Sequence, residues 1–181
     1  MSEFERPVCL PVLALRGLCV FPKMLTHFDV GRKSSMAAVE EALREDQQIF
    51  LVTQKDVETD HPKRNDLYTV GTVSIVKQVL RLPGENMRIL VEGQYRAELL
   101  DIVQSEPYLF GRMQKLEELP YNHSLPRVEA LLRQAHSQFE QFAELSGRNM
   151  QEALLRLLTS EDAGYTADFI GQDATFSYQN K

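Results

Sequence analysis

The sequence contains no tryptophan and only two cysteines, Cys9 and Cys19, among its 181 residues. The two thiols lie too far apart for a CxxC redox or zinc motif, and a reducing compartment argues against a disulfide between them. Because each lies in an apolar stretch, we expect both to be small core residues. No apolar run approaches the roughly 18 residues that span a bilayer, so no membrane partner is expected. Residues 1–10 lack the basic start and apolar centre of a signal peptide, which predicts a cytoplasmic location.

Patterns that carry catalysis, metal binding or nucleotide binding are also missing. The histidines, His27, His61, His123 and His136, form no HExxH or other close ligand pair. The segment 31–34, Gly-Arg-Lys-Ser, lacks the glycine before lysine and the second upstream glycine that a phosphate-binding loop needs, so a strand-to-helix turn is favoured. No GxSxG serine occurs. We therefore expect no catalytic residue, no cofactor and no metal in this chain.

The net charge of −6 bears on nucleic acid as a partner. A domain that binds phosphates of nucleic acid usually carries a basic face. The densest basic stretches here are Arg32-Lys33 and Lys63-Arg64, and neither has aromatic residues interleaved. The sequence thus disfavours nucleic acid.

Short apolar and alternating segments, separated by turn residues, fill the first two thirds of the chain and predict a barrel or sandwich. The expected strands cover residues 8–15, 18–21, 25–30, 48–53, 68–82, 87–91, 95–103 and 108–116. Strict alternation places Ile75 and Leu80 on opposite faces of their strand. One helix interrupts the series, and Ser34 or Ser35 can cap it. Its apolar face is expected to hold Met36, Val39 and Leu43.

The composition changes where Pro120 and Pro126 flank a polar stretch, which predicts a linker. After it, apolar residues follow the three-and-four spacing of a helix. Gly147 is expected to end this helix, Asn149 to cap a second one, and Gly171 to end a third that Thr159 or Ser160 caps. The sequence thus predicts an α+β chain, with a β-domain over residues 1–119 and a helical subdomain over 120–181.

Several motifs carry a resemblance along nearly the whole chain. They are Leu10-Pro11-Val12-Leu13-Ala14-Leu15-Arg16, Val20-Phe21-Pro22-Lys23-Met24, Val30-Gly31-Arg32, residues 48–56, Asp66-Leu67-Tyr68-Thr69-Val70-Gly71-Thr72, Leu82-Pro83-Gly84, Leu90-Val91-Glu92-Gly93 with Arg96, Ser160-Glu161-Asp162 and Ala167-Asp168-Phe169-Ile170. In this order they resemble the N-terminal domain of bacterial ATP-dependent Lon proteases of the LonA type. One departure is the segment 14–17, Ala-Leu-Arg-Gly, where the family more often has Pro-Leu-Arg-Asp/Asn. We expect only a local effect, because the motifs are chiefly a fold signature.

The resemblance implies a fold and a role. The fold is a PUA-like pseudo-β-barrel with one inserted helix, followed by a small helical bundle. The role is non-catalytic substrate recognition and assembly, within an ATP-dependent Ser–Lys protease that degrades unfolded, damaged and selected regulatory proteins. Implied partners are unfolded or degron-bearing polypeptides and further copies of the protein in a homohexamer. ATP and Mg²⁺ are expected only in an ATPase domain, which we expect to follow a long helix beyond this chain.

Two alternatives use the same motifs. One is a stand-alone Lon-domain protein that acts as a structural or interaction module, or as an RNA-binding module, since PUA-like folds elsewhere bind RNA. The polar tail, without a closing apolar element, favours a fragment instead. The other is the related drug-binding ubiquitin-ligase adaptor. Its tryptophan cage and four-cysteine zinc site cannot be built from this sequence.

Recognition of unfolded polypeptide requires exposed apolar surface. The candidate substrate-binding residues are Pro22, Met24 and Leu25 after the first strands, and Leu82 and Met87 beside the expected hairpin turn. Methionine adapts to varied partners, which favours the two methionines. The alternative interpretation is that Met24 and Leu25 are ordinary core residues.

Overall fold

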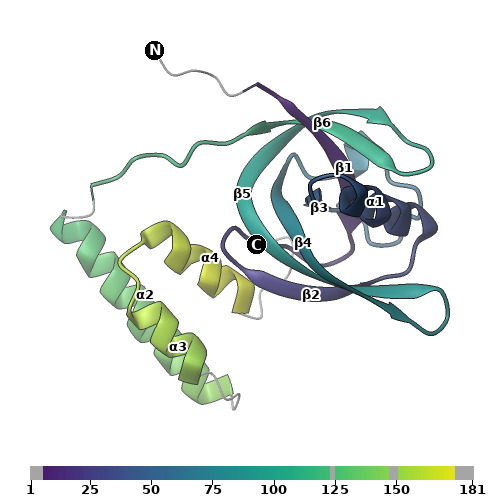
Figure 1. The fold of residues 1–181 in the computed structure, drawn as a ribbon. Helices are drawn as coiled ribbons and strands as arrows, with labels where there is room; N and C mark the ends of the chain where they lie inside the picture. Colours follow the sequence, from purple (N-terminus) through teal and green to yellow (C-terminus); the bar gives the residue numbers. More distant parts are fainter. Residues whose placement is uncertain (1–5, 123–124, 147–150, 174–181) are drawn as a thin grey trace. The chain divides into compact units, whose positions relative to one another are not determined.

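The computed structural model describes residues 6–122, 125–146 and 151–173 of the chain. They form two compact units, a β-rich unit that ends at Glu117 and a helical unit that begins at Glu118 (Figure 1). The β-rich unit contains one curled sheet and one inserted helix, so the predicted α+β class is confirmed.

The sheet of the β-rich unit has six strands in the order β2-β5-β4-β3-β1-β6. Their bounds are β1 Val8–Leu15, β2 Leu25–Val30, β3 Gln48–Thr53, β4 Val70–Leu82, β5 Asn86–Gln104 and β6 Leu109–Lys115. The strand β5 also pairs with β6, so β1, β3, β4, β5 and β6 close into a ring (Figure 1). Only β1 and β3, among the strands that the structure describes, run parallel. Strand β2 lies outside this ring, paired with the first half of β5.

The two predicted strands 87–91 and 95–103 form one strand, β5, of 19 residues. Gly93 pairs with Ser74 and Tyr95 pairs with Val73, so Gln94 is an extra residue on β5. A β-bulge of this kind accommodates one unpaired residue without ending the strand. The predicted break was therefore wrong.

The predicted strand 18–21 was also wrong, because this segment is irregular. Hydroxyl groups of the neighbouring strands satisfy its carbonyls. Thr53 Oγ1 donates to the Leu18 carbonyl at 2.7 Å, and Thr72 Oγ1 donates to the Val20 carbonyl at 2.7 Å. The apolar side chains are β-prone, but the backbone hydrogen bonds go to side chains instead of a ladder.

The strands β1 and β3 are buried on both faces and separate two cores. Inside the ring, residues such as Phe50, Leu99 and Met113 are fully buried. On the other face lies the helix α1, Lys33–Arg44, which packs its fully buried residues Ala38, Val39 and Ala42 against the sheet.

The ends and the outer side of α1 differ from the sequence prediction. Leu43, expected on the apolar face, is exposed. Neither Ser34 nor Ser35 caps the helix, because Arg32 occupies the N-cap position and makes no side-chain cap bond. The helix therefore begins two residues earlier than a cap at Ser34 would allow, and three earlier than a cap at Ser35.

Neither cysteine forms a disulfide with a described residue, and only one is partly sheltered. Cys19 is half-buried, and its Sγ lies 3.4 Å from Thr53 Oγ1. Cys9 is exposed, because the first two residues of β1 lie outside the core that the rest of the strand enters. The prediction of two core thiols was therefore wrong for Cys9.

The helical unit contains α2 Pro126–Ser146, α3 Gln151–Leu158 and α4 Ala163–Asp173. Phe139 of α2 packs edge-on against Phe169 of α4, with ring centroids 6.0 Å apart, and Leu157 is fully buried. Asp162 caps α4, since its Oδ1 accepts the Tyr165 N–H at 3.1 Å.

The ends of the helices in this unit also differ from the prediction. Thr159 and Ser160 are not the cap of α4, and Gly171 lies inside that helix. The predicted stop at Gly147 and cap at Asn149 lie outside the described residues. None of the described helices is long and apolar enough to cross a membrane.

Candidate functional site

The residues 21–24, named here the 21–24 turn, connect the irregular segment to β2. Pro22 takes the second position and Lys23, with φ of 63°, the third, as in a type II turn. The Lys23 N–H donates to the Gly93 carbonyl at 2.8 Å, and the Gly93 N–H donates to the Met24 carbonyl at 2.9 Å. The turn is thereby fastened to the middle of β5.

This fastening buries two of the five candidate residues. Pro22 is buried and Met24 is 7% exposed. Their expected exposure was wrong, because Gly93 has no side chain and lets the turn lie directly on β5. For Met24, the alternative interpretation as a core residue is confirmed.

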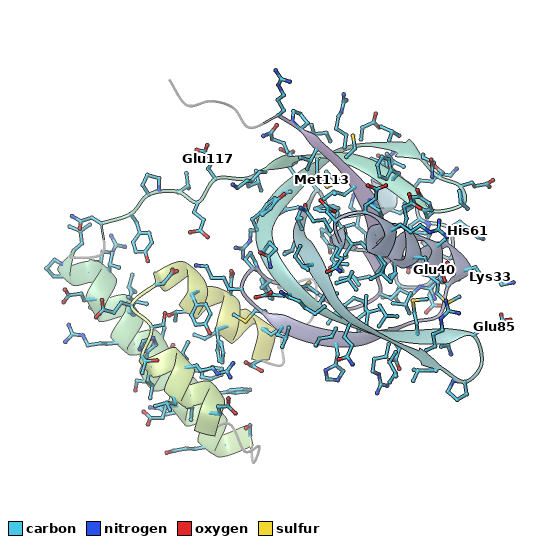
Figure 2. All side chains as sticks on the ribbon, in the orientation of Figure 1. Lys33, Glu40, His61, Glu85, Met113 and Glu117 are labelled. Atoms are coloured by element: carbon cyan, nitrogen blue, oxygen red, sulfur yellow. The ribbon has the colours of Figure 1, made fainter. Side chains whose placement is uncertain are left out.

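Two further candidates flank the β4–β5 hairpin, whose tip carries Glu85 (Figure 2). Its loop contains the expected turn, with Gly84 at φ 83°, followed by Glu85 at φ 59°. Leu82 is half-buried at the base of the loop. Met87 is only 5% exposed, because it pairs with Val30 and faces the core beneath α1. The expected exposure was therefore wrong for Met87.

Leu25, the first residue of β2, is 63% exposed, so its interpretation as a core residue was wrong. The strand register places it on a shared face of β2, β5 and β4. Glu92 of β5 pairs with Leu25 of β2 on one side and with Ile75 of β4 on the other. Further along β5, Leu90 pairs with Gln78 and Arg88 pairs with Leu80, both on β4. The apolar members of this surface, named here the outer apolar face, are Leu25, Ile75, Leu80, Leu82 and Leu90.

A β-bulge builds this face from residues that alternation alone would separate. Val76 pairs with Val91 and Gln78 with Leu90, which leaves Lys77 as an extra residue. The shift turns Leu80, 54% exposed, to the same side as Ile75. Strict alternation had placed these two side chains on opposite faces. The sequence offers no clear signal for the bulge, and Leu80 and Ile75 were not among the candidates.

Charges on the outer apolar face are paired across the strands. Arg88 donates from Nε and Nη2 to the two carboxylate oxygens of Asp29, at 2.6 and 2.9 Å. These hydrogen bonds lower the pKa of Asp29 and raise the pKa of Arg88. Lys77 Nζ lies 2.6 Å from Glu92 Oε2. Pairing neutralises the charged groups between the leucines, so the face combines apolar area with little local net charge.

The helical unit also exposes leucine side chains. Leu131 and Leu145 of α2 are 56% and 88% exposed, and Leu155 and Leu158 of α3 are 65% and 46% exposed. The first pair is separated by about four helical turns and so shares one side of α2. In the described part of the chain, no group of three or more His, Cys, Asp or Glu side chains could hold a metal ion.

Comparisons with known proteins show which protein family shares this sequence and architecture. The family model of the ATP-dependent protease La (LON) substrate-binding domain matches residues 9–181. The Lon protease of Heliobacterium modesticaldum is 41% identical over 172 residues, which cover 95% of this chain and 21% of that protein. Lon protease 1 of Bacillus subtilis is 35% identical over 180 residues, covering 99% of this chain and 23% of that protein. This chain therefore spans about a fifth of the length of these curated relatives.

A solved structure shares the fold. The N-terminal domain of Mycobacterium avium complex Lon protease superposes with a TM-score of 0.76 at 19% sequence identity, covering 96% of this chain and 87% of that one. At this identity the likeness concerns the fold.

Proposed function

The chain belongs to the family of Lon protease substrate-binding domains, and on this premise we propose that its outer apolar face binds unfolded or degron-bearing polypeptides. The observation that carries the proposal is the exposure of Leu25 and Leu80, at 63% and 54%, on one face of a rigid sheet. Unfolded chains offer apolar side chains without a fixed sequence, so an apolar surface with little net charge suits them.

The arrangement of charges supports this role. The Asp29–Arg88 and Lys77–Glu92 pairs balance the charge between the leucines. Paired charges between the leucines keep the free protein soluble, while the apolar side chains supply most of the binding energy. The face would then select polypeptides by the apolar content of their sequences and not by their charge.

Binding to a reduced and alkylated model protein tests the proposal. The double variant Leu25→Ser/Leu80→Ser removes the two most exposed apolar side chains of the face without adding charge. Fluorescence anisotropy should show an affinity at least roughly tenfold weaker, as expected for the loss of central apolar contacts. The matched control is Leu43→Ser on α1, a leucine that is 41% exposed away from this face. Equal affinities for the control and the double variant would refute the assignment.

The same premise sets the role of the chain within a larger protein. We propose that it supplies recognition only, and that ATP, Mg²⁺ and the Ser–Lys protease chemistry belong to other parts of a cytoplasmic protein. Membership of a family of substrate-binding domains from an ATP-dependent protease supports this division. A peptidase and ATPase assay of the 181-residue chain should therefore give no turnover. Turnover that a single substitution abolishes would contradict it.

Self-association toward a homohexamer is a second proposed role, and the exposed leucines of the helical unit favour it. Leu131 and Leu145 present apolar area along one side of α2. Sedimentation velocity should show a concentration-dependent larger species that Leu131→Ser/Leu145→Ser abolishes. A monomer at every concentration would oppose this role for the chain, while leaving the polypeptide-binding test unaffected.

A further inference from the structure

A cavity of about 1010 Å³ lies in the β-rich unit, away from the outer apolar face. Its walls come from β1, from the first turn of α1, and from the loops 60–63 and 105–107. Lys33 and His61, which both line it, lie on the same side of the unit in Figure 2. The apolar part of the lining comes from residues such as Val12, Ala14 and Leu109.

The N-terminus of α1 opens into this cavity. Met36 is the first residue whose N–H bonds within the helix, to the Arg32 carbonyl at 2.9 Å. The N–H groups of Lys33, Ser34 and Ser35 donate to no acceptor in the part of the chain that the structure describes, and no side chain caps the helix. Uncapped N–H groups and the helix dipole together favour a negative group at this position.

A largely buried serine at the same place supports a ligand independently. Ser35 is 7% exposed and lines the cavity. Its hydroxyl makes no hydrogen bond to any other described residue, and its oxygen is not among the fully enclosed atoms, so it stays accessible. A hydroxyl held in this way can donate to an oxygen atom of a bound molecule.

The charged residues that line the cavity are the cations Arg32, Lys33 and Lys63 and the carboxylates Asp60 and Glu106, a balance that favours an anion. Arg32 is held by two neutral acceptors, the carbonyls of Ala14 and Asp60, and forms no ion pair with a described carboxylate. Burial, and then the proximity of Arg16, lower the pKa of its guanidinium, and the Asp60 carboxylate offsets only part of this effect. Lys33 likewise has no carboxylate partner among the described residues. The Asp60 carboxylate is engaged by Arg16 at 2.7 Å.

We propose that this cavity is an oxyanion-binding site, in which the first turn of α1, the Ser35 hydroxyl and the cations of Arg32 and Lys33 hold a carboxylate or a phosphate. The ligand's apolar portion would contact Val12, Ala14 and Leu109. The site is separate from the proposed polypeptide-binding face and does not depend on it. Charge-assisted hydrogen bonds of this kind are roughly twice as strong as hydrogen bonds between neutral groups.

Amide chemical shifts of the 181-residue chain test the site. One titration uses inorganic phosphate, and another a short acetylated apolar peptide with a free terminal carboxylate. The same peptide with an amidated terminus, and sodium chloride at equal ionic strength, are the ligand controls. The amides of residues 33–35 should show saturable shifts with phosphate, with the free carboxylate, or with both. Response to phosphate alone or to the carboxylate alone identifies which oxyanion the site takes.

Three variants distinguish a built site from general attraction to positive charge. Lys33→Gln and Ser35→Ala should each weaken binding at least roughly fivefold, as the loss of one charge-assisted contact predicts. Arg44→Gln, which removes one cation from the opposite end of the same helix, should leave affinity unchanged. Shifts that do not saturate, that occur equally with chloride or the amidated peptide, or that persist in both site variants would overturn the proposal. These results would not affect the test of Leu25 and Leu80.

Discussion

Gly93 determines how the 21–24 turn lies on β5, and its replacement by alanine gives a quantitative prediction. A Cβ at this position would lie 2.1 Å from the carbonyl oxygen of Phe21, 2.9 Å from its carbonyl carbon and 3.2 Å from the Cα of Pro22. All three are backbone atoms, so no rotamer change can relieve the collision. The turn must move away from β5.

The expected loss of stability follows from what this movement breaks. Two backbone hydrogen bonds join Gly93 to Lys23 and Met24, and each contributes about 0.5–1.5 kcal/mol. Partial exposure of the Met24 side chain adds about 1 kcal/mol. The smaller conformational freedom of alanine in the unfolded chain offsets about 0.4–1 kcal/mol. Gly93→Ala should therefore reduce the free energy of unfolding by about 2 kcal/mol.

Urea unfolding monitored by circular dichroism measures this change, with Gly84→Ala as the control. Gly84 has φ of 83°, but a Cβ added to it would meet no atom within 4 Å, so only backbone strain is added there. That strain, about 1 kcal/mol, is largely offset by the unfolded-state effect. If Gly93→Ala is no less stable than Gly84→Ala, the reasoning about the turn is refuted.

Three other changes test separate parts of the structure. Hydrogen bonds from Arg88 lower the pKa of Asp29, so the pair stabilises the fold above the ordinary carboxyl pKa and is lost as pH falls through the lowered value. Stability measured by urea titration below about pH 4 should thus fall less steeply in Asp29→Asn; an unchanged slope would count against the pair. Leu157→Ala, at a fully buried position of the helical unit, should destabilise that unit by about 2–5 kcal/mol, seen as a lower unfolding midpoint. Thr72→Val leaves the Val20 carbonyl without its 2.7 Å donor and should lower the unfolding free energy by about 1–3 kcal/mol, whereas a neutral result would show that this carbonyl finds another donor.

Local patterns predicted most elements of the β-rich unit. The strands β1, β2 and β3 and the turn at Gly84 follow from apolar patterning and turn chemistry, which act within a few residues. The failures occurred where distant residues decide the outcome. The segment 18–21 is β-prone, yet hydroxyls of Thr53 and Thr72, far along the chain, take its carbonyls.

The candidate site shows the same limit. Met24 and Met87 were chosen as adaptable exposed residues, but the packing of the 21–24 turn on Gly93 and of β5 beneath α1 buries them. Leu80 was not a candidate, and a bulge at Lys77 reverses the side to which it points. Exposure depends on register and close backbone approach, and neither can be read from alternation alone.

The central claim is that the outer apolar face contacts unfolded polypeptide, and paramagnetic broadening tests it most directly. An unfolded model protein carrying one nitroxide label is added to the ¹⁵N-labelled chain, and signal loss is measured for each amide. The account predicts selective broadening along β2 and at the facing residues of β4 and β5 around Leu80 and Leu90, with little effect at Arg44. Broadening confined to other surfaces, with Leu25 and Leu80 unaffected at saturation, would contradict it.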